Sequence, residues 1–440
     1  MTQQHMAHGK DGGLTAGSIS LIGAVAMGTG VMIGAGIFAL TGQIAGLAGP
    51  WFPLSFIAGA IVTSFSAYTY IAMSNTWPSS GGIAMILTKA YGPGAVAAAA
   101  SLLMALSMVI NESLVARTFA TYALRPFDIE GGPLVPVIGV GLIIFAYVIN
   151  ASGNRSVGLW SIVMSGFKIG GIALFGIAAL WASGGDWQAN GSEKTAPLGF
   201  VASVALSILA FKGFTTITNS GAEIVDPHRN VGRTIMISIA ICVVVYLLVA
   251  FAVGASLPSE QIRAAQDYAL AEAAEPVLGR SGFYLTVALA MVATASGIIA
   301  SVFAVSRMLA MLTDMKMIPH SHFGMSGTIQ SHTLIYTVVI AGLLTVLFDL
   351  SRIASLGAFF YLVMDMAVHW GVWRNLRDQI AARGWILLTA LLLDAVVLVA
   401  FTTLKWRSDP MIVIYAVVGI ALVFAYERVF LDQWTKTQEE

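Results

Sequence analysis

Long apolar segments without charged residues recur along the whole chain. Of its 440 residues, 58% are hydrophobic and only 10% are charged, and the mean hydropathy is +0.84. A helix needs about 20 apolar residues to cross a bilayer, and in lipid only helices and closed barrels satisfy their backbone polar groups. We therefore predict an all-α polytopic membrane protein with twelve transmembrane helices, at residues 17–48, 52–74, 94–124, 134–150, 157–182, 198–225, 232–256, 280–311, 332–348, 352–374, 384–404 and 410–428.

The segments between these spans are short. Residues 1–16 do not show the basic stretch, short apolar core and cleavage site of a signal peptide. The amphipathic stretch 258–276 is predicted to form a surface helix before the eighth span. Lysine and arginine are more frequent in the loops on the side of the N-terminus, which predicts that the tails 1–16 and 429–440 are both cytoplasmic.

Two glycines near the middle of the first span disfavour an uninterrupted helix. Glycine costs about 1 kcal/mol in a helix interior, and both Gly34 and Gly36 lie there. We predict a helix broken at mid-depth, with the N–H groups of residues 34–36, Ala35 included, facing a substrate carboxylate and Ile33 offering a carbonyl. The alternative is close helix packing, because Gly30 and Gly34 form a GxxxG motif.

The sixth span holds a second anomaly. Lys212 and Gly213 stand side by side near its middle and are followed by hydroxyl residues. A second break here would free the carbonyls of Ala210 and Phe211 to accept hydrogen bonds from a substrate ammonium. Phe211 or Phe214 could cover the bound molecule, and ordinary packing is an equally good interpretation of either ring.

The two predicted breaks lie five spans apart in helices of opposite orientation. This arrangement is typical of an inverted five-plus-five repeat. We predict that residues 17–182 form the first repeat and residues 198–376 the second. The last two spans, within residues 384–428, would lie outside the repeat.

Three further polar residues at membrane depth are candidates for chemistry. Ionisable groups inside a bilayer are costly, and each is a functional hypothesis by default. Lys168 is a candidate for proton coupling or a structural lysine, and Glu112 could be a proton site, a partner of a lysine or the floor of a pocket. Lys212 would favour an anionic substrate side chain if it faces the pocket. Ser296 is a candidate pocket hydroxyl.

Other polar residues are expected to have structural roles. Asp365 and Asp394 are predicted to belong to interior ion pairs or to lie nearer the surface. Glu223 is expected to close the cytoplasmic end of the sixth helix against Arg229 or Arg233. Three histidines of one predicted loop have no acidic or cysteine companions and are predicted to be solvated: His320, His322 and His332. No metal site is therefore expected.

Three segments stand out together: Gly34-Ala35-Gly36-Ile37-Phe38 with Gly42 and Gly49-Pro50; Trp77-Pro78-Ser79-Ser80-Gly81-Gly82 with Lys89-Ala90-Tyr91-Gly92; and Gly213-Phe214 with Asn219, Glu223 and Asp226-Pro227-His228-Arg229-Asn230-Val231-Gly232-Arg233. In this order they resemble motifs of the amino acid–polyamine–organocation superfamily, most nearly its bacterial proton-coupled amino acid permeases. The resemblance implies the LeuT-type fold, with helices 1 and 6 broken. It also implies that the Lys168 ammonium takes the place of a sodium ion and bonds carbonyls of the first helix.

The resulting functional prediction is a secondary transporter that imports amino acids by alternating access, proton-coupled and independent of sodium. The alternatives are an amino acid or amine exchanger, a polyamine transporter and a non-transporting nutrient sensor. An enzyme is not expected, because no Asp-rich metal motif or His/Asp/Ser catalytic group stands near an interface. The expected partners are a small-molecule amino acid and the lipid bilayer, with no nucleic acid and no cofactor besides the proton. A monomer or weak oligomer in the bacterial cytoplasmic membrane is predicted.

Overall fold

The computed structural model describes residues 17–151, 154–189, 196–318 and 328–439, with the side chains of Ala35, 154–165 and 431–439 excepted. Within these ranges the regular elements are helices, and the β pairing is confined to one isolated bridge between Ile19 and Ile224. The longer helices are α1 (Leu21–Ala48), α2 (Phe52–Thr76), α3 (Gly82–Tyr91), α4 (Ala95–Leu124), α5 (Leu134–Ala151), α6 (Asn154–Ala182), α7 (Pro197–Phe211), α9 (Pro227–Ser256), α11 (Ala269–Asp314), α12 (Ile329–Leu347), α13 (Leu350–Asn375), α14 (Gly384–Ser408) and α15 (Pro410–Glu439).

The helices have the length and composition of membrane spans. Ten helical segments of the described chain are long and apolar enough to cross a bilayer. The first of these, Gly36–Thr76, takes in part of α1 and all of α2, and Leu21–Gly34 and Gly166–Ala182 are shorter apolar helices. The prediction of a polytopic all-helical membrane protein is confirmed. The count of twelve spans and the inverted repeat stay predictions.

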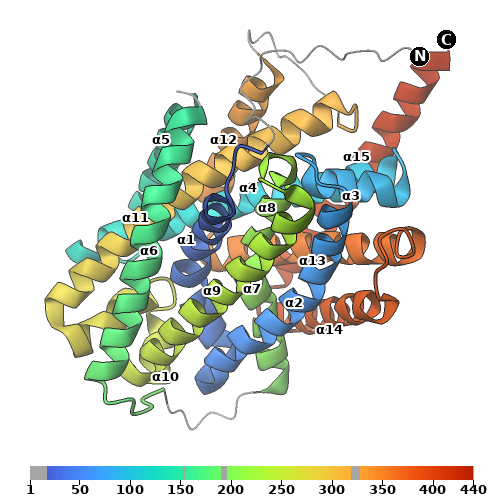
Figure 1. The fold of residues 1–440 in the computed structure, drawn as a ribbon. Helices are drawn as coiled ribbons and strands as arrows, with labels where there is room; N and C mark the ends of the chain where they lie inside the picture. Colours follow the sequence, from blue (N-terminus) through green and yellow to red (C-terminus); the bar gives the residue numbers. More distant parts are fainter. Residues whose placement is uncertain (1–16, 152–153, 190–195, 319–327, 440) are drawn as a thin grey trace.

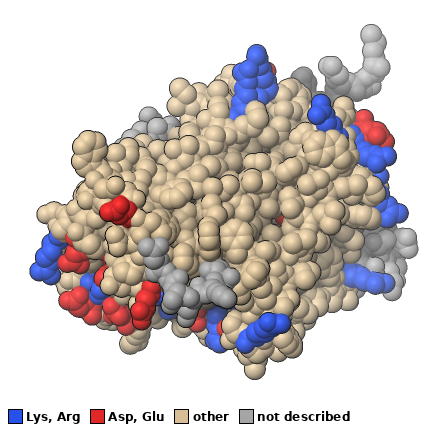
Figure 2. All heavy atoms as spheres, turned by 90° about the horizontal axis from the view of Figure 1, so that it is seen from below, with Lys and Arg blue, Asp and Glu red and all other residues tan. Residues whose placement is uncertain are grey.

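The outer surface fits a lipid environment. Figure 2 shows a broad face of uncharged atoms, with lysine, arginine, aspartate and glutamate gathered mostly toward its edges. Large apolar side chains are exposed along α5, α12, α14 and α15, including Ile144, Leu343, Leu392 and Val417. Such extended apolar exposure is unusual for a protein in water, and in a bilayer these side chains meet acyl chains.

Helix α1 lies in the interior of the bundle, where it packs against α6, α7, α9 and α11 (Figure 1). It is continuous from Leu21 to Ala48, so the predicted break at residues 34–36 is wrong. The physical reason is close packing. A Cβ atom at Gly34 would lie 3.2 Å from the Ala293 carbonyl oxygen, and one at Gly36 would lie 2.9 Å from that of Ala210. The two glycines let neighbouring backbones approach α1, and this is the close packing that the GxxxG alternative predicted for Gly34.

The predicted break in the sixth span is confirmed. Helix α7 ends at Phe211 and is followed by a 3₁₀ turn, η3 (Lys212–Phe214), the four-residue helix α8 (Thr215–Thr218) and a second 3₁₀ turn, η4 (Gly221–Glu223). Hydroxyl groups bond to local carbonyls here. Thr215 Oγ1 donates to the Lys212 oxygen at 2.8 Å, and Thr218 Oγ1 donates to the Thr215 oxygen at 2.6 Å. Such local bonds compete with a regular helix and explain why the chain breaks after Phe211.

The stretch before the eighth span forms two pieces. The short helix α10 (Ser259–Ala264) is separate, and α11 then begins at Ala269. Gly279, with φ of 67°, interrupts the helical geometry inside α11. The single surface helix predicted over 258–276 is therefore wrong, because residues 265–268 form a turn that packs on α1.

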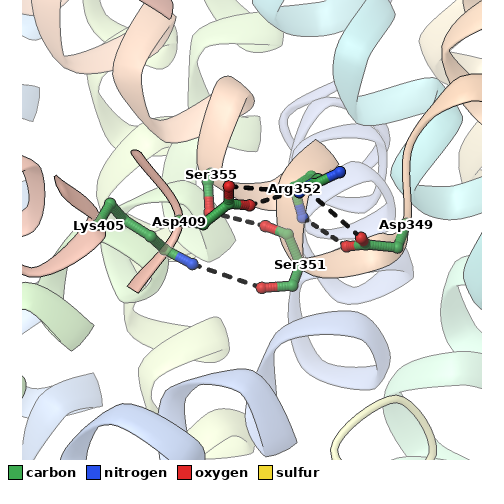
Figure 3. A network of polar contacts seen from close by, with 6 residues as sticks. All are labelled: Asp349, Ser351, Arg352, Ser355, Lys405 and Asp409. Carbon is green, nitrogen blue, oxygen red and sulfur yellow. Dashed lines mark hydrogen bonds and ion pairs between the residues drawn. The ribbon is translucent and has the colours of Figure 1, made fainter. Parts of the chain in front are cut away.

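A network of hydrogen bonds and ion pairs connects the start of α13 to the turn between α14 and α15 (Figure 3). The Asp349 carboxylate accepts from the Arg352 backbone N–H at 2.9 Å and caps α13. The Arg352 side chain donates to both Asp409 oxygens, at 2.7 and 3.3 Å, and lowers the pKa of that carboxyl. Lys405 donates to Ser351 at 3.4 Å. These contacts hold α13 and α14 in a fixed relation at this end.

Candidate functional site

A small cavity lies where α1, α4 and α11 meet the break after α7. Its volume is about 20 Å³, which is room for about one water molecule. The cavity is lined by Val31, Met32, Gly36, Met104, Met108, Asn111, Leu209, Ala210, Lys212, Gly213, Thr215, Thr216 and Ser301. Of the predicted site residues, the structure thus brings together Gly36, Ala210, Lys212 and Gly213.

Lys212 faces this cavity from the 3₁₀ turn η3. Its ammonium donates to the Ser107 carbonyl oxygen at 2.8 Å and to the Ser107 hydroxyl at 2.9 Å. The side chain is buried, and an ammonium carries three N–H donors, so these bonds leave one donor for another acceptor. Lys212 therefore places an amine with one free N–H in the cavity wall.

Glu112 lies directly behind the cavity wall on α4. Its Oε1 is 3.4 Å from the hydroxyl of Ser301, which lines the cavity, and among the described residues its Oε2 has no hydrogen-bond partner. The buried carboxyl is near enough to Lys212 for an electrostatic attraction between the two charges. The prediction that Glu112 partners a lysine fits this geometry, and Ser301 separates it from the cavity.

Lys168 reaches α1 from α6. Its ammonium is buried and donates to the Gly30 carbonyl oxygen at 2.8 Å. The contact that the resemblance implies, between this ammonium and a carbonyl of the first helix, is therefore present. It places the lysine amine beside α1, about one turn before Gly34.

Tyr246 on α9 joins the two helices that border the cavity, and the sequence-based prediction missed it. Its hydroxyl lies 2.7 Å from the Met32 oxygen on α1 and 3.1 Å from the Ala210 oxygen on α7. Its ring packs against Phe211, with 4.9 Å between centroids. The available signal is a phenol in the middle of an apolar span, because a buried tyrosine hydroxyl usually has a hydrogen-bond partner.

Both candidate gate rings are packed in the core. Neither Phe211 nor Phe214 lines the cavity, and both are fully buried. Phe211 packs on Tyr246, and Phe214 meets Tyr70 edge to face at 5.4 Å. The packing alternative therefore describes both rings in this structure.

Three further predicted site residues lie away from the cavity wall. Ile33 is fully buried but does not line the cavity, and neither does Gly34, which faces α11. Ser296 Oγ donates to the Ala293 oxygen of its own helix at 3.1 Å, and Ser301 supplies the α11 hydroxyl at the cavity instead. The side chain of Ala35 lies outside the described residues.

A second cavity, of about 240 Å³, lies against the C-terminal part of α4. It is bordered by Arg117 and Arg125 from α4 and by Asp267 and Tyr268 from the turn before α11. Burial raises the pKa of Asp267, while a hydrogen bond of 2.6 Å from Gln43 opposes the shift. This cavity thus offers both signs of charge.

Two contacts lie on either side of the central cavity. Phe38 of α1 and Tyr122 of α4 meet edge to face at 5.6 Å, toward the second cavity. At the other end of α7–α8, Glu223 pairs with Arg307 of α11 at 2.5 Å. The prediction that Glu223 pairs with Arg229 or Arg233 is wrong, because Arg307 of α11 binds its carboxylate instead.

The expectation of solvated loop histidines also needs correction. His332 is fully buried on α12, whose first turn begins at Ile329 rather than after this residue. His320 and His322 lie outside the described residues.

A multi-span helical bundle that encloses a small buried cavity with a few polar groups, beside a broken helix, is the architecture of a membrane transporter. The chain belongs to the amino acid permease family, whose model matches residues 19–429. This match places it in the amino acid–polyamine–organocation superfamily, and the predicted family is confirmed.

Individual relatives agree with this assignment. The inner membrane transport protein YbaT of Escherichia coli is 29% identical over 411 residues, which cover 92% of this chain and 94% of that protein. The uncharacterized protein MJ0609 of Methanocaldococcus jannaschii is 29% identical over 80% of this chain and 81% of its own length. The branched-chain amino acid permease BcaP of Lactococcus lactis is 27% identical over 51% of this chain and 53% of its own length.

Proposed function

We propose that this protein is a secondary active transporter that imports amino acids, driven by protons and independent of sodium. The observation that carries the proposal is the Lys168 ammonium, which lies 2.8 Å from the Gly30 carbonyl oxygen of α1. An ammonium fixed there provides the positive charge that a sodium ion would otherwise bring. Because burial disfavours a charged lysine, a proton can leave and return at this position during transport.

The central cavity is the proposed substrate site. Lys212 is its cation, and we propose that the remaining N–H of this ammonium binds the substrate carboxylate. The Ala210 carbonyl lies near the end of α7, at the cavity, and it is the proposed acceptor for the substrate ammonium. Because the cavity is too small for an amino acid, binding requires an opening of α1 relative to α7 and α8.

This movement is the proposed transport cycle. The Phe38–Tyr122 contact would part on one side and the Glu223–Arg307 pair on the other, so that the cavity faces one side at a time. The proposed setting is a monomer or weak oligomer in a bacterial cytoplasmic membrane, with both termini in the cytoplasm and no catalytic role. A fixed cation in the cavity disfavours polyamines as cargo.

Uptake into proteoliposomes tests this function. Labelled amino acids are offered with and without an inward proton gradient, in sodium and in potassium buffers. We expect uptake of at least one amino acid that the proton gradient accelerates and sodium leaves unchanged. Uptake that appears only when amino acid is loaded inside would identify an exchanger, and no uptake or exchange of any amino acid would contradict transport.

Replacing Lys212 by methionine should weaken amino acid binding. A hydrogen bond to a charged group contributes about 1.5–3 kcal/mol, so we expect affinity to fall about 10- to 100-fold for acidic, neutral and basic amino acids alike, because all of them carry the α-carboxylate. Competition in a thermal-shift assay with acidic, neutral and basic amino acids measures the effect. Unchanged affinities in a folded variant would show that the substrate does not contact Lys212.

A further inference from the structure

Three ionisable side chains meet in the interior, away from the central cavity. Asp365 and His369 are one turn apart on α13, Asp394 comes from α14, and all three side chains are fully buried. One ligand atom from each lies within 4.8 Å of the other two. Ionisable groups at this depth are costly, so their meeting calls for a physical cause.

The spacing between them is too wide for direct hydrogen bonds. His369 Nε2 is 3.5 Å from Asp365 Oδ1 and 3.6 Å from Asp394 Oδ2, whereas hydrogen bonds of this kind measure about 2.7–3.2 Å. A tetrahedral zinc ion with bonds of about 2.1 Å holds its ligand atoms about 3.4 Å apart. The two distances from His369 Nε2 match that separation, and both exceed the length of a direct hydrogen bond.

Hydroxyl groups from α2 orient the same side chains from behind. Thr69 Oγ1 lies 2.8 Å from His369 Nδ1, so a hydrogen on Nδ1 leaves the lone pair of Nε2 directed at the two carboxylates. Asp365 accepts from the Ser66 hydroxyl at 2.7 Å and from the Tyr70 hydroxyl at 2.5 Å. Metal-binding histidines and carboxylates are typically held by such outer partners.

Except for Asp365 Oδ1, which accepts from the Tyr70 hydroxyl, the inner atoms lack partners of their own. Within the described chain, both Asp394 oxygens and His369 Nε2 are buried without a hydrogen bond. Among the described ion pairs, neither carboxylate is joined to a lysine or arginine. Two carboxylates that are buried together in their ionised form require compensating charge, and a divalent ion with two carboxylates and a neutral imidazole is neutral overall.

We propose that Asp365, His369 and Asp394 bind a divalent transition-metal ion, for which zinc is the probe. One imidazole nitrogen with two carboxylate oxygens is a donor set that zinc accepts. The ion would link α14 to α13 near the middle of the membrane. This proposal differs from the expectation, drawn from the sequence, that the chain holds no metal, and that expectation stays a prediction.

Zinc binding by the purified full chain tests the proposal directly. The protein is prepared without a polyhistidine tag, stripped with a chelator and titrated with zinc, and bound metal is measured after gel filtration. We expect one zinc per chain, with X-ray absorption showing only nitrogen and oxygen ligands at about 2.0–2.2 Å. A wild-type protein that retains no zinc would overturn the proposal, whatever the variants do.

Variants locate the site. Asp394→Asn should abolish zinc retention, and Thr69→Val, which removes only an outer partner, should lower zinc affinity about 10- to 100-fold. Asp378→Asn is the matched control, because Asp378 carries the same group on an exposed turn and should bind zinc like the wild type. Equal zinc binding by all of these proteins would assign the metal to surface residues and overturn the proposal.

Discussion

Replacing Lys168 by methionine is expected to abolish proton-driven uptake, with a fall of more than tenfold in its rate. Methionine keeps much of the apolar stem but removes the ammonium that donates to the Gly30 oxygen. The α1–α6 contact then has neither its charge nor its hydrogen bond, and no group at this position can exchange a proton. Initial uptake rates in proteoliposomes, at several external pH values, measure the loss.

Lys405→Met is the control for this experiment. Lys405 is another largely buried lysine, but it lies in the last turn of α14, where it bonds the Ser351 hydroxyl away from α1. Its replacement should leave the pH dependence of uptake unchanged. A Lys168→Met protein that still shows full proton-driven uptake would refute the coupling role and would leave Lys168 as a structural contact.

Gly42→Ala is expected to destabilise the closed arrangement at the C-terminal part of α1. The new Cβ would lie 2.2 Å from the Gln266 carbonyl oxygen and 2.6 Å from the Gln266 Cα. Both are backbone atoms, so the turn before α11 has to move. Overpacking of this kind costs about 1–3 kcal/mol. Thermal unfolding in detergent should show a lower midpoint, and uptake should change with it.

Gly46→Ala provides a matched comparison on the same helix. A Cβ there meets only the far end of the Gln266 side chain, at 3.8 Å. Alanine is the better helix former by up to about 1 kcal/mol, so this variant should be as stable as the wild type or more stable. Equal unfolding midpoints for the two variants would show that the turn at Gln266 does not hold α1.

Local sequence features predicted the parts of the fold that depend on neighbouring residues. The apolar spans follow from composition, because a bilayer admits few alternatives to helices. The break after Phe211 follows from a lysine, a glycine and several threonines in a row, whose side chains compete with the helical backbone. The contact of Lys168 with α1 came from the family resemblance, since spacing along the chain does not place α6 beside α1.

Features that depend on distant partners could not be predicted in this way. Gly34 and Gly36 are compatible with a helix break and equally with close packing. The neighbours that decide between these two interpretations lie on α7 and α11, more than 150 residues away in the sequence. The meeting of Asp365 with Asp394 depends on the packing of α13 on α14. The role of Tyr246 depends on two helices that are distant in sequence, because its hydroxyl lies between the Met32 and Ala210 oxygens.

The Tyr246 hydroxyl has a consequence for how α1 and α7 can separate. A phenol carries one hydrogen, so it can serve only one of the two carbonyls at full strength, and Met32 is the nearer at 2.7 Å. The Ala210 oxygen, at 3.1 Å, keeps spare accepting capacity. If α7 moves away, the phenol keeps its shorter hydrogen bond to the Met32 oxygen of α1 and loses only the longer contact with Ala210. Separation of α7 from α1 would then leave the Ala210 oxygen without this phenol, free to accept a hydrogen bond from another donor.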